Sequence, residues 1–98
     1  MTRFVSVHPL AREEVNEAAT YYSLRSPVLA ASLVEAFDRA VADLADFPEI
    51  GAPVRGDLRR KVLRRFPYSV LYRVLANEVR ILVFMHHHRR PSYWHHRA

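Results

Sequence analysis

Residues 85–98 concentrate the side chains that could do chemistry. They contain five of the six histidines, three arginines, a tyrosine and the only tryptophan, and they follow directly on an apolar run at residues 79–84. Imidazoles transfer protons near neutral pH, guanidinium groups hold phosphate, and aromatic rings stack on bases. This mixture is more typical of a surface that meets phosphate, bases or acidic protein than of an incidental polar tail.

Cleavage of RNA is one reaction that such residues could support. It needs a group that deprotonates a 2′-hydroxyl, cations that hold the scissile phosphate, and an acid for the leaving oxygen. Histidine, tyrosine and arginine supply these functions in principle, although residue types alone do not specify a nuclease. The candidates near the end of the chain are His86, His87, His88, Arg89, Arg90, Tyr93 and Arg97.

A second cationic segment lies at residues 58–66, Leu-Arg-Arg-Lys-Val-Leu-Arg-Arg-Phe. Side chains alternate between the two faces of a strand, so both faces would carry positive charge. One face would hold Arg60, Val62, Arg64 and Phe66, and the other Arg59, Lys61, Leu63 and Arg65. Two interpretations stay open: a solvated outer strand whose charges block edge pairing, or a surface that contacts phosphate.

The histidines do not form a convincing metal site. His86 and His88 share one face if the last strand continues that far, but two ligands are too few for a closed site and no carboxylate is near in sequence. His95 and His96 could complete such a site only through a fold-back that the sequence does not predict. We therefore expect no metal and no cofactor.

Composition limits the class of protein. The 98 residues suffice for one domain, spanning 1–98, and half of them are hydrophobic, which excludes a disordered chain. No apolar stretch approaches the roughly 20 residues that a membrane span needs, so we expect no membrane association. Cysteine is absent, which excludes disulfides and thiolate chemistry and agrees with a cytoplasmic location.

The charges are unevenly distributed. The formal net charge is +5, eight of the ten acidic residues lie within residues 11–49, and eleven of the fifteen Lys and Arg residues lie from residue 55 onward. We expect an acidic-to-neutral helical side and a strongly basic side. A basic face attracts nucleic acid or an acidic protein partner.

The first half of the chain reads as a strand and two helices. Residues 4–7 predict a short strand, and apolar residues at helical spacing predict a helix from Pro9 to about Arg25. Ser26 followed by proline is a helix-start signal, and Pro48 ends the second helix. So short a link between two helices predicts an antiparallel helical hairpin.

The second half reads as a loop and three strands. Residues 48–57 contain two prolines and two glycines and predict a loop, followed by strands at residues 58–66, 68–75 and 78–87. Ala76 and Asn77 form the hairpin turn between the last two strands. Alternation places the following residues of the last strand on one face: Val79, Ile81, Val83 and Met85. The predicted fold is α+β: an N-terminal strand and a helical hairpin packed on a small, mostly antiparallel sheet, with a short C-terminal tail or helix.

Several segments, in this order and spacing, resemble the RelE/ParE superfamily of toxins from type II toxin–antitoxin systems. They are residues 11–22, 44–51, 64–73 and 79–91, and the Phe-Pro-Tyr-x-x-x-Tyr-Arg run followed by a strand and His-x-x-Arg is the most specific of them. The resemblance covers nearly the whole chain. It implies the same helical hairpin against a small antiparallel sheet.

The resemblance implies one of two activities. RelE-like members cut mRNA on the ribosome with basic residues of the middle strands and an Arg, His or Tyr near the C-terminus. ParE-like members bind DNA gyrase and inhibit it. Arg60 and Arg64 match two basic positions of the RelE-like nucleases. Val62 and Ser69 stand at two other positions where those nucleases carry a cation. His-x-x-Arg near the end also looks ParE-like.

We therefore expect a gyrase-directed toxin without enzymatic activity. The alternatives are a ribosome-dependent mRNA endoribonuclease and a non-toxic basic module that binds nucleic acid. If the chain is a nuclease, its expected catalytic residues are Arg60, Arg64, His86, Arg89 and Tyr93. The expected contacts with target or phosphate are Arg59, Lys61, Arg65, Arg73, His88, Arg90 and Arg97.

Either branch implies a cognate antitoxin that covers the basic surface in a hetero-oligomer. Large aromatic side chains on the surface would anchor it. Tyr21, Tyr22 and Trp94 are the expected anchors, and Phe37 is a further candidate. For Phe37 and Tyr22, packing in the core is the favoured interpretation.

Overall fold

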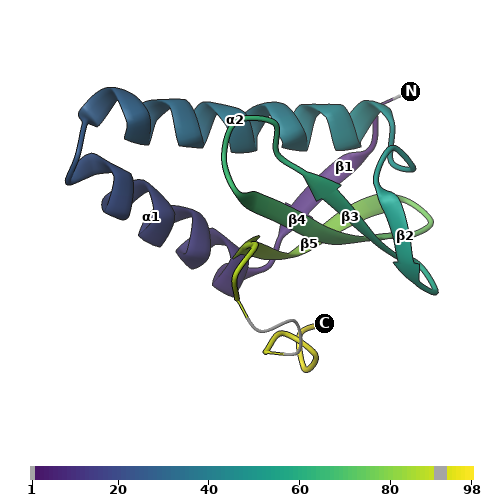
Figure 1. Cartoon of the computed structure of the whole chain (residues 1–98). Coiled ribbons are helices and arrows are strands. Elements are labelled where there is room, and N and C mark those ends of the chain that lie inside the picture. Colours follow the sequence, from purple (N-terminus) through teal and green to yellow (C-terminus); the bar gives the residue numbers. More distant parts are fainter. Residues whose placement is uncertain (1, 90–92) are drawn as a thin grey trace.

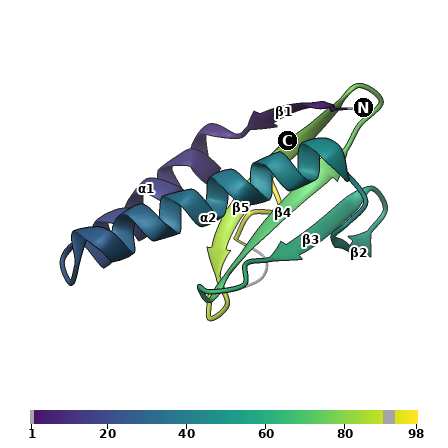
Figure 2. The same cartoon turned by 90° about the horizontal axis from the view of Figure 1, so that it is seen from above.

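Two helices and five strands follow one another along the chain, in a computed structural model that describes residues 2–89 and 93–98. The order is β1 (Phe4–Val7), α1 (Pro9–Ser23), α2 (Pro27–Asp46), β2 (Ala52–Arg55), β3 (Leu58–Val62), β4 (Tyr68–Val74) and β5 (Glu78–His86). The strands form one sheet in the order β1-β5-β4-β3-β2, and only the β1–β5 pair is parallel. The two helices lie together over one face of the sheet (Figures 1 and 2). This confirms the predicted α+β fold.

The helices begin at caps that the local sequence provides. Ser26 Oγ accepts a hydrogen bond from Val28 N at 3.2 Å, with Pro27 at the first helical position of α2. His8 plays the same role for α1, because its Nδ1 accepts from Leu10 N at 3.1 Å. Within the described residues, neither helix is long and apolar enough to cross a membrane.

The main core lies between the helices and the sheet. Its helical contribution is the apolar stripe that the sequence predicted, comprising Ala11, Val15, Ala18, Leu33, Phe37 and Leu44. A second, smaller cluster lies on the other face of the sheet, where the segment of residues 93–98 packs. It consists of Leu58, Leu71, Leu82, Val83 and Trp94, with Met85 and Tyr93 packed against it.

Strand β5 contributes to both cores because its register shifts by one residue. Leu71 pairs with Val83 and Tyr72 with Ile81, so that Leu82 is an extra residue on β5. Leu82 and Val83 both belong to the second cluster, whereas Ile81 belongs to the main core. The expectation that alternation gives Ile81 and Val83 the same face is therefore wrong, because it ignored the bulge.

Strand β3 is shorter than predicted. It ends at Val62, and residues 63–67 form the loop to β4, in which Leu63 N donates to Tyr68 O at 3.0 Å. Leu63 and Phe66 are both buried in the main core, which strict alternation of a strand would not allow. The arginines at positions 64 and 65 consequently lie on a loop and not on a strand.

The segment of residues 48–57, predicted as a loop, contains the four-residue strand β2. β2 pairs with β3 at the edge of the sheet, with Pro53 opposite Arg59. An edge strand tolerates proline because one row of its backbone groups has no ladder partner. All four side chains of β2 are exposed. The sequence of this strand therefore shows no alternation of apolar and polar residues, which is why it was predicted as a loop.

A buried tyrosine fastens the segment between α2 and β2 to the sheet. Tyr72 is 0% exposed, and its hydroxyl donates to Pro48 O at 2.7 Å and accepts from Gly51 N at 2.9 Å. A Cβ on Gly51 would lie 2.6 Å from that hydroxyl and 2.8 Å from Arg60 O, so only glycine fits. Arg59 donates to Glu49 O and Gly51 O from the same side. Burial raises the pKa of Tyr72, which keeps the hydroxyl neutral.

We expect Tyr72→Phe to lower the free energy of unfolding by about 1–3 kcal/mol, because Pro48 O and Gly51 N would both lose a buried partner. Urea denaturation measures the change. Tyr22→Phe is the matched control, since its ring packs against the same core and, among the described residues, its hydroxyl makes no hydrogen bond. Equal stability of the two variants would show that the Tyr72 hydroxyl does not hold this segment.

Candidate target-binding surface

Several cations predicted to contact phosphate are engaged inside the protein. Lys61 Nζ lies 3.9 Å from an oxygen of Asp43, and Arg73 Nε lies 3.8 Å from one of Asp57. Arg59 is engaged with the two backbone carbonyls of the residue 48–51 segment, and Arg97 forms a 2.8 Å ion pair with a carboxylate of α1. Arg59 and Arg97 are thus tied to other parts of the fold, whereas the pairs of Lys61 and Arg73 are partly exposed and contribute little to stability.

Other cations gather at one end of the sheet. Antiparallel pairing places Val62 of β3 opposite Ser69 of β4, and Tyr68 of β4 opposite His86 of β5. The end of β3, the loop after it and the end of β5 are therefore neighbours. This region, which we call the cationic end, comprises Arg60, Arg64, Arg65, His88 and Arg89, all exposed. None of them forms an ion pair with an acidic side chain of residues 2–89 or 93–98. Arg90, also predicted to bind phosphate, lies outside the described residues.

A chain of polar contacts lies next to the cationic end. Arg60 Nε donates to Ser69 Oγ at 2.9 Å, and Ser69 Oγ lies 3.0 Å from His87 Nε2. Ser69 is 0% exposed, so its hydroxyl is shielded from solvent and bridges Arg60 and His87.

The Nδ1 atom of His86 is also engaged in a hydrogen bond. His86 Nδ1 accepts from His88 N at 3.1 Å, and the imidazole rings of these two residues stack with centroids 5.2 Å apart. Burial lowers the pKa of His86, and the neighbouring His88 and His87 lower it further. Among the described residues, no three His, Asp or Glu side chains gather closely enough to hold a metal ion.

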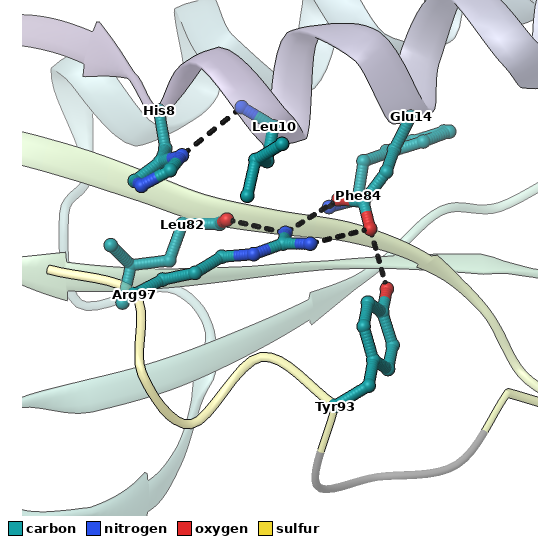
Figure 3. A network of polar contacts seen from close by, with 7 residues as sticks. All are labelled: His8, Leu10, Glu14, Leu82, Phe84, Tyr93 and Arg97. Atoms are coloured by element: carbon teal, nitrogen blue, oxygen red, sulfur yellow. Dashed lines mark hydrogen bonds and ion pairs between the residues drawn. The ribbon is translucent and has the colours of Figure 1, made fainter.

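Glu14 of α1 organises the end of the chain (Figure 3). Its Oε1 accepts from Phe84 N at 3.1 Å, and its Oε2 accepts from the Tyr93 hydroxyl at 2.8 Å. Arg97 donates to both oxygens of Glu14 and, in addition, to Leu82 O at 3.0 Å. Burial and the hydrogen bond to Glu14 raise the pKa of Tyr93 well above its usual range.

This network changes the roles expected for two residues. The proton of the Tyr93 hydroxyl and the charge of Arg97 are both directed at Glu14, and Arg89 lies over the Tyr93 ring at 4.4 Å from its centroid. Sequence reasoning missed Glu14, because it lies on a helix more than 60 residues before its partners. It also missed Ser69 and His87 as a bonded pair. Only the pairing of Tyr68 with His86 could have indicated that they are close.

The three expected aromatic anchors differ in exposure. Tyr21 is 49% exposed and hydrogen-bonds to Arg25, whose guanidinium lies over the ring. Tyr22 is half-buried, with its ring edge-on to Phe66. Trp94 is only 9% exposed, so the expectation that it is a surface group is wrong. Phe37 is 0% exposed, which confirms the interpretation that it packs in the core. Both fill apolar clusters.

A groove of about 470 Å³ runs between α2 and the end of β3. Ile50 and Val62 expose about half of their side-chain surface there. Arg64 and Arg65 form its cationic rim, continuous with the cationic end. The remaining lining residues are Ser32, Glu35, Ala36, Arg39, Ala40, Asp43, Lys61 and Leu63.

Comparison with solved structures agrees with this architecture. The chain superposes on a chain of the chromosomal ParDE toxin–antitoxin system of P. aeruginosa with a TM-score of 0.75, at 21% identity, covering 87% of this chain and 96% of that one. An E. coli RelE mutant in the free state gives 0.65 at 18% identity, covering 90% and 86%. The M. tuberculosis toxin–antitoxin complex RelBE2 gives 0.60 at 26% identity, covering 88% and 99%.

Sequence comparison identifies the family. The chain is 35% identical over 81 residues to a Sinorhizobium fredii protein named "Putative toxin Y4kP", covering 82% of this chain and 83% of that protein. Residues 5–91 match the model of the ParE toxin of the type II toxin–antitoxin system, parDE. The chain therefore belongs to the ParE family of type II toxin–antitoxin toxins.

Proposed function

We propose that this toxin acts by binding DNA gyrase through the cationic end, without cleaving a substrate. Membership of the ParE family and the similarity to a ParDE chain support this choice of target. The cationic end provides positive charge without acidic partners among the described residues, and such a surface accelerates association with an acidic protein or with a protein–DNA complex.

The observation that carries the proposal is that the acid–base groups are already engaged. A general base must present a free lone pair to the substrate, and a general acid must present its proton. His86 Nδ1 accepts a hydrogen bond from His88 N, and His87 Nε2 lies within hydrogen-bond distance of the buried Ser69 hydroxyl. The Tyr93 hydroxyl donates to Glu14. Ser69 is fully buried. A binding surface needs none of these groups to be free.

An mRNA endoribonuclease is the second candidate. Arg60 and His87 are exposed next to one another across Ser69, which favours this activity because a cation and an imidazole could meet one phosphate group. It would require His87 to release Ser69. Tyr93 would also have to leave Glu14. These rearrangements make this candidate the weaker of the two.

We further propose that the toxin is neutralised by an antitoxin that docks in the groove between α2 and β3. The groove combines the exposed apolar side chains of Ile50 and Val62 with the cations Arg64 and Arg65. An acidic, apolar segment seated there would cover part of the cationic end and block the target by occlusion. Of the three predicted anchors, Tyr21 is the most exposed and remains proposed as an outer contact.

The purified toxin is expected to inhibit supercoiling by gyrase. Arg64→Met should weaken inhibition about tenfold, the order of effect expected when one charge leaves a complementary interface. Arg55→Met is the matched control: it removes the same charge from an exposed position on β2, outside the cationic end. Supercoiling activity against toxin concentration gives both values.

Supercoiling that is unaffected by folded toxin would contradict the gyrase target. A parallel arm adds the toxin to a cell-free translation reaction and maps mRNA ends. Cuts at codon-defined positions that need translating ribosomes would establish the second candidate instead. Intact mRNA together with inhibited gyrase is the expected result.

Ile50→Glu is expected to abolish neutralisation while leaving growth arrest intact, because it places a negative charge in the groove meant for an acidic segment. Affinity for the antitoxin should fall by about tenfold or more. Val54→Glu is the control, since Val54 is equally exposed on β2 and does not line the groove. The measurement is growth on coexpression with the antitoxin, sought as a small reading frame adjoining the toxin gene. Full neutralisation of the Ile50 variant would place the antitoxin elsewhere.

A further inference from the structure

His8 caps the start of α1 with its side chain. Its Nδ1 accepts a hydrogen bond from Leu10 N at 3.1 Å, and its backbone N donates to Ile81 O of β5 at 2.8 Å. A backbone N–H can only donate, so the Nδ1 atom that accepts this hydrogen bond carries no proton. The usual capping residues serine, threonine and asparagine keep their acceptor at any pH. The cap at His8 works only while its imidazole is neutral.

Positive charge surrounds this imidazole. His8 and Arg97 both lie beside the first turns of α1 (Figure 3), and Arg80 of β5 and His96 also lie close enough to act on the charge of His8. The one carboxylate that acts on it, Glu14 of α1, is already paired with Arg97 at 2.8 Å. The N-terminus of a helix adds partial positive charge. Burial lowers the pKa of His8, and Arg80 and Arg97 lower it further.

The segment of residues 93–98 is the part of the fold that this charge would affect most. Arg97 holds the segment to Glu14, and Trp94 packs it against the second apolar cluster. The segment forms neither helix nor strand, and Trp94 Nε1 and Arg97 Nε are buried without a hydrogen-bond partner among the described residues. A buried unpaired N–H lowers the stability of the docked state. The segment is therefore held less firmly than its burial alone would suggest.

Protonation of His8 should weaken the docking of this segment. The new charge would stand near Arg97 and His96, which the segment itself brings to His8 when it docks. The docked state therefore favours the neutral imidazole, and the pKa of His8 is lower in that state than in the undocked one. Docking is strongest above the ordinary imidazole pKa of about 6.5 and weakens as the pH falls below it, toward the lower pKa of the docked state.

We propose that His8 is an acid-sensitive switch for the segment of residues 93–98, which undocks from α1 and from the second apolar cluster when His8 takes up a proton. Undocking releases the Tyr93 hydroxyl from Glu14 and uncovers the cluster. Because the guanidinium of Arg89 lies over the Tyr93 ring, undocking also changes the surroundings of the cationic end. The switch does not depend on whether gyrase or the ribosome is the target.

The indole N–H of Trp94, the only tryptophan of the chain, reports the docking equilibrium. It is buried and makes no hydrogen bond to the described residues, so its hydrogen exchange with solvent requires the segment to undock. NMR measures the exchange rate. Its protection factor is the rate of a free indole divided by the observed rate at the same pH, which removes the pH dependence of exchange itself. This protection factor gives the ratio of docked to undocked segment.

Between about pH 7.5 and about pH 5.5, which spans the ordinary pKa of histidine, the protection factor of the wild type should fall about fivefold, the order of effect expected of one partly exposed like-charge contact. His8→Asn should lose most of this fall, because asparagine keeps the cap and takes up no proton. His95→Gln is the matched control. The His95 ring lies edge-on to Trp94 with centroids 4.8 Å apart, so it is the alternative sensor, and its removal should leave the fall intact. A constant wild-type protection factor, or a fall that His8→Asn retains, would overturn the proposal.

A second measurement keeps the test decisive if the His8 variant does not fold. Docking and protonation of His8 oppose one another, so by reciprocity a variant that weakens docking must raise the pKa of His8. Arg97→Met removes a neighbouring charge and the ion pair with Glu14, at a position outside all helices and strands. NMR titration of the His8 ring should therefore give a higher pKa in this variant than in the wild type. Equal pKa values would show that His8 does not sense the segment. Far-UV circular dichroism checks the fold of each variant.

Discussion

The arrangement of the molecule depends on the one-residue register shift in strand β5. Because Leu82 is an extra residue, Ile81 and Phe84 both reach the core under the helices, while Leu82 and Val83 between them reach the opposite face. One strand can therefore support two apolar clusters. Without the shift, strict alternation would place Ile81 and Phe84 on opposite faces of the sheet, so that they could not both pack under the helices.

The cations on the two faces of the sheet contact different groups. Under the helices, Lys61 reaches Asp43 of α2, and Arg59 reaches the carbonyls of the segment before β2. On the other face, Arg97 reaches Glu14 beside the second cluster. The arginines of the β3–β4 loop have no comparable acidic partner in the described residues. These two exposed arginines lie at the rim of the groove between α2 and β3.

Local sequence was sufficient for the elements with strong signals. Ser26 and Pro27 fixed the start of α2, and the stripe through Leu33, Phe37 and Leu44 fixed its buried face. The fold class followed from these patterns and from the resemblance to known toxins. β2 was missed because its four exposed residues carry no alternation. The roles of Tyr93 and Arg97 could not be predicted, since they depend on Glu14, which only the tertiary structure brings near.

We propose that Arg59 and Arg97 stabilise the fold, whereas the arginines of the β3–β4 loop contact the target. The most direct test is a methionine scan that measures melting temperature and growth arrest for each variant. Substitution of Arg64 or Arg65 should weaken arrest at unchanged melting temperature, whereas substitution of Arg59 or Arg97 should lower the melting temperature. Loss of arrest that follows melting temperature across all four positions, or full arrest by the Arg64 and Arg65 variants, would contradict this division of roles.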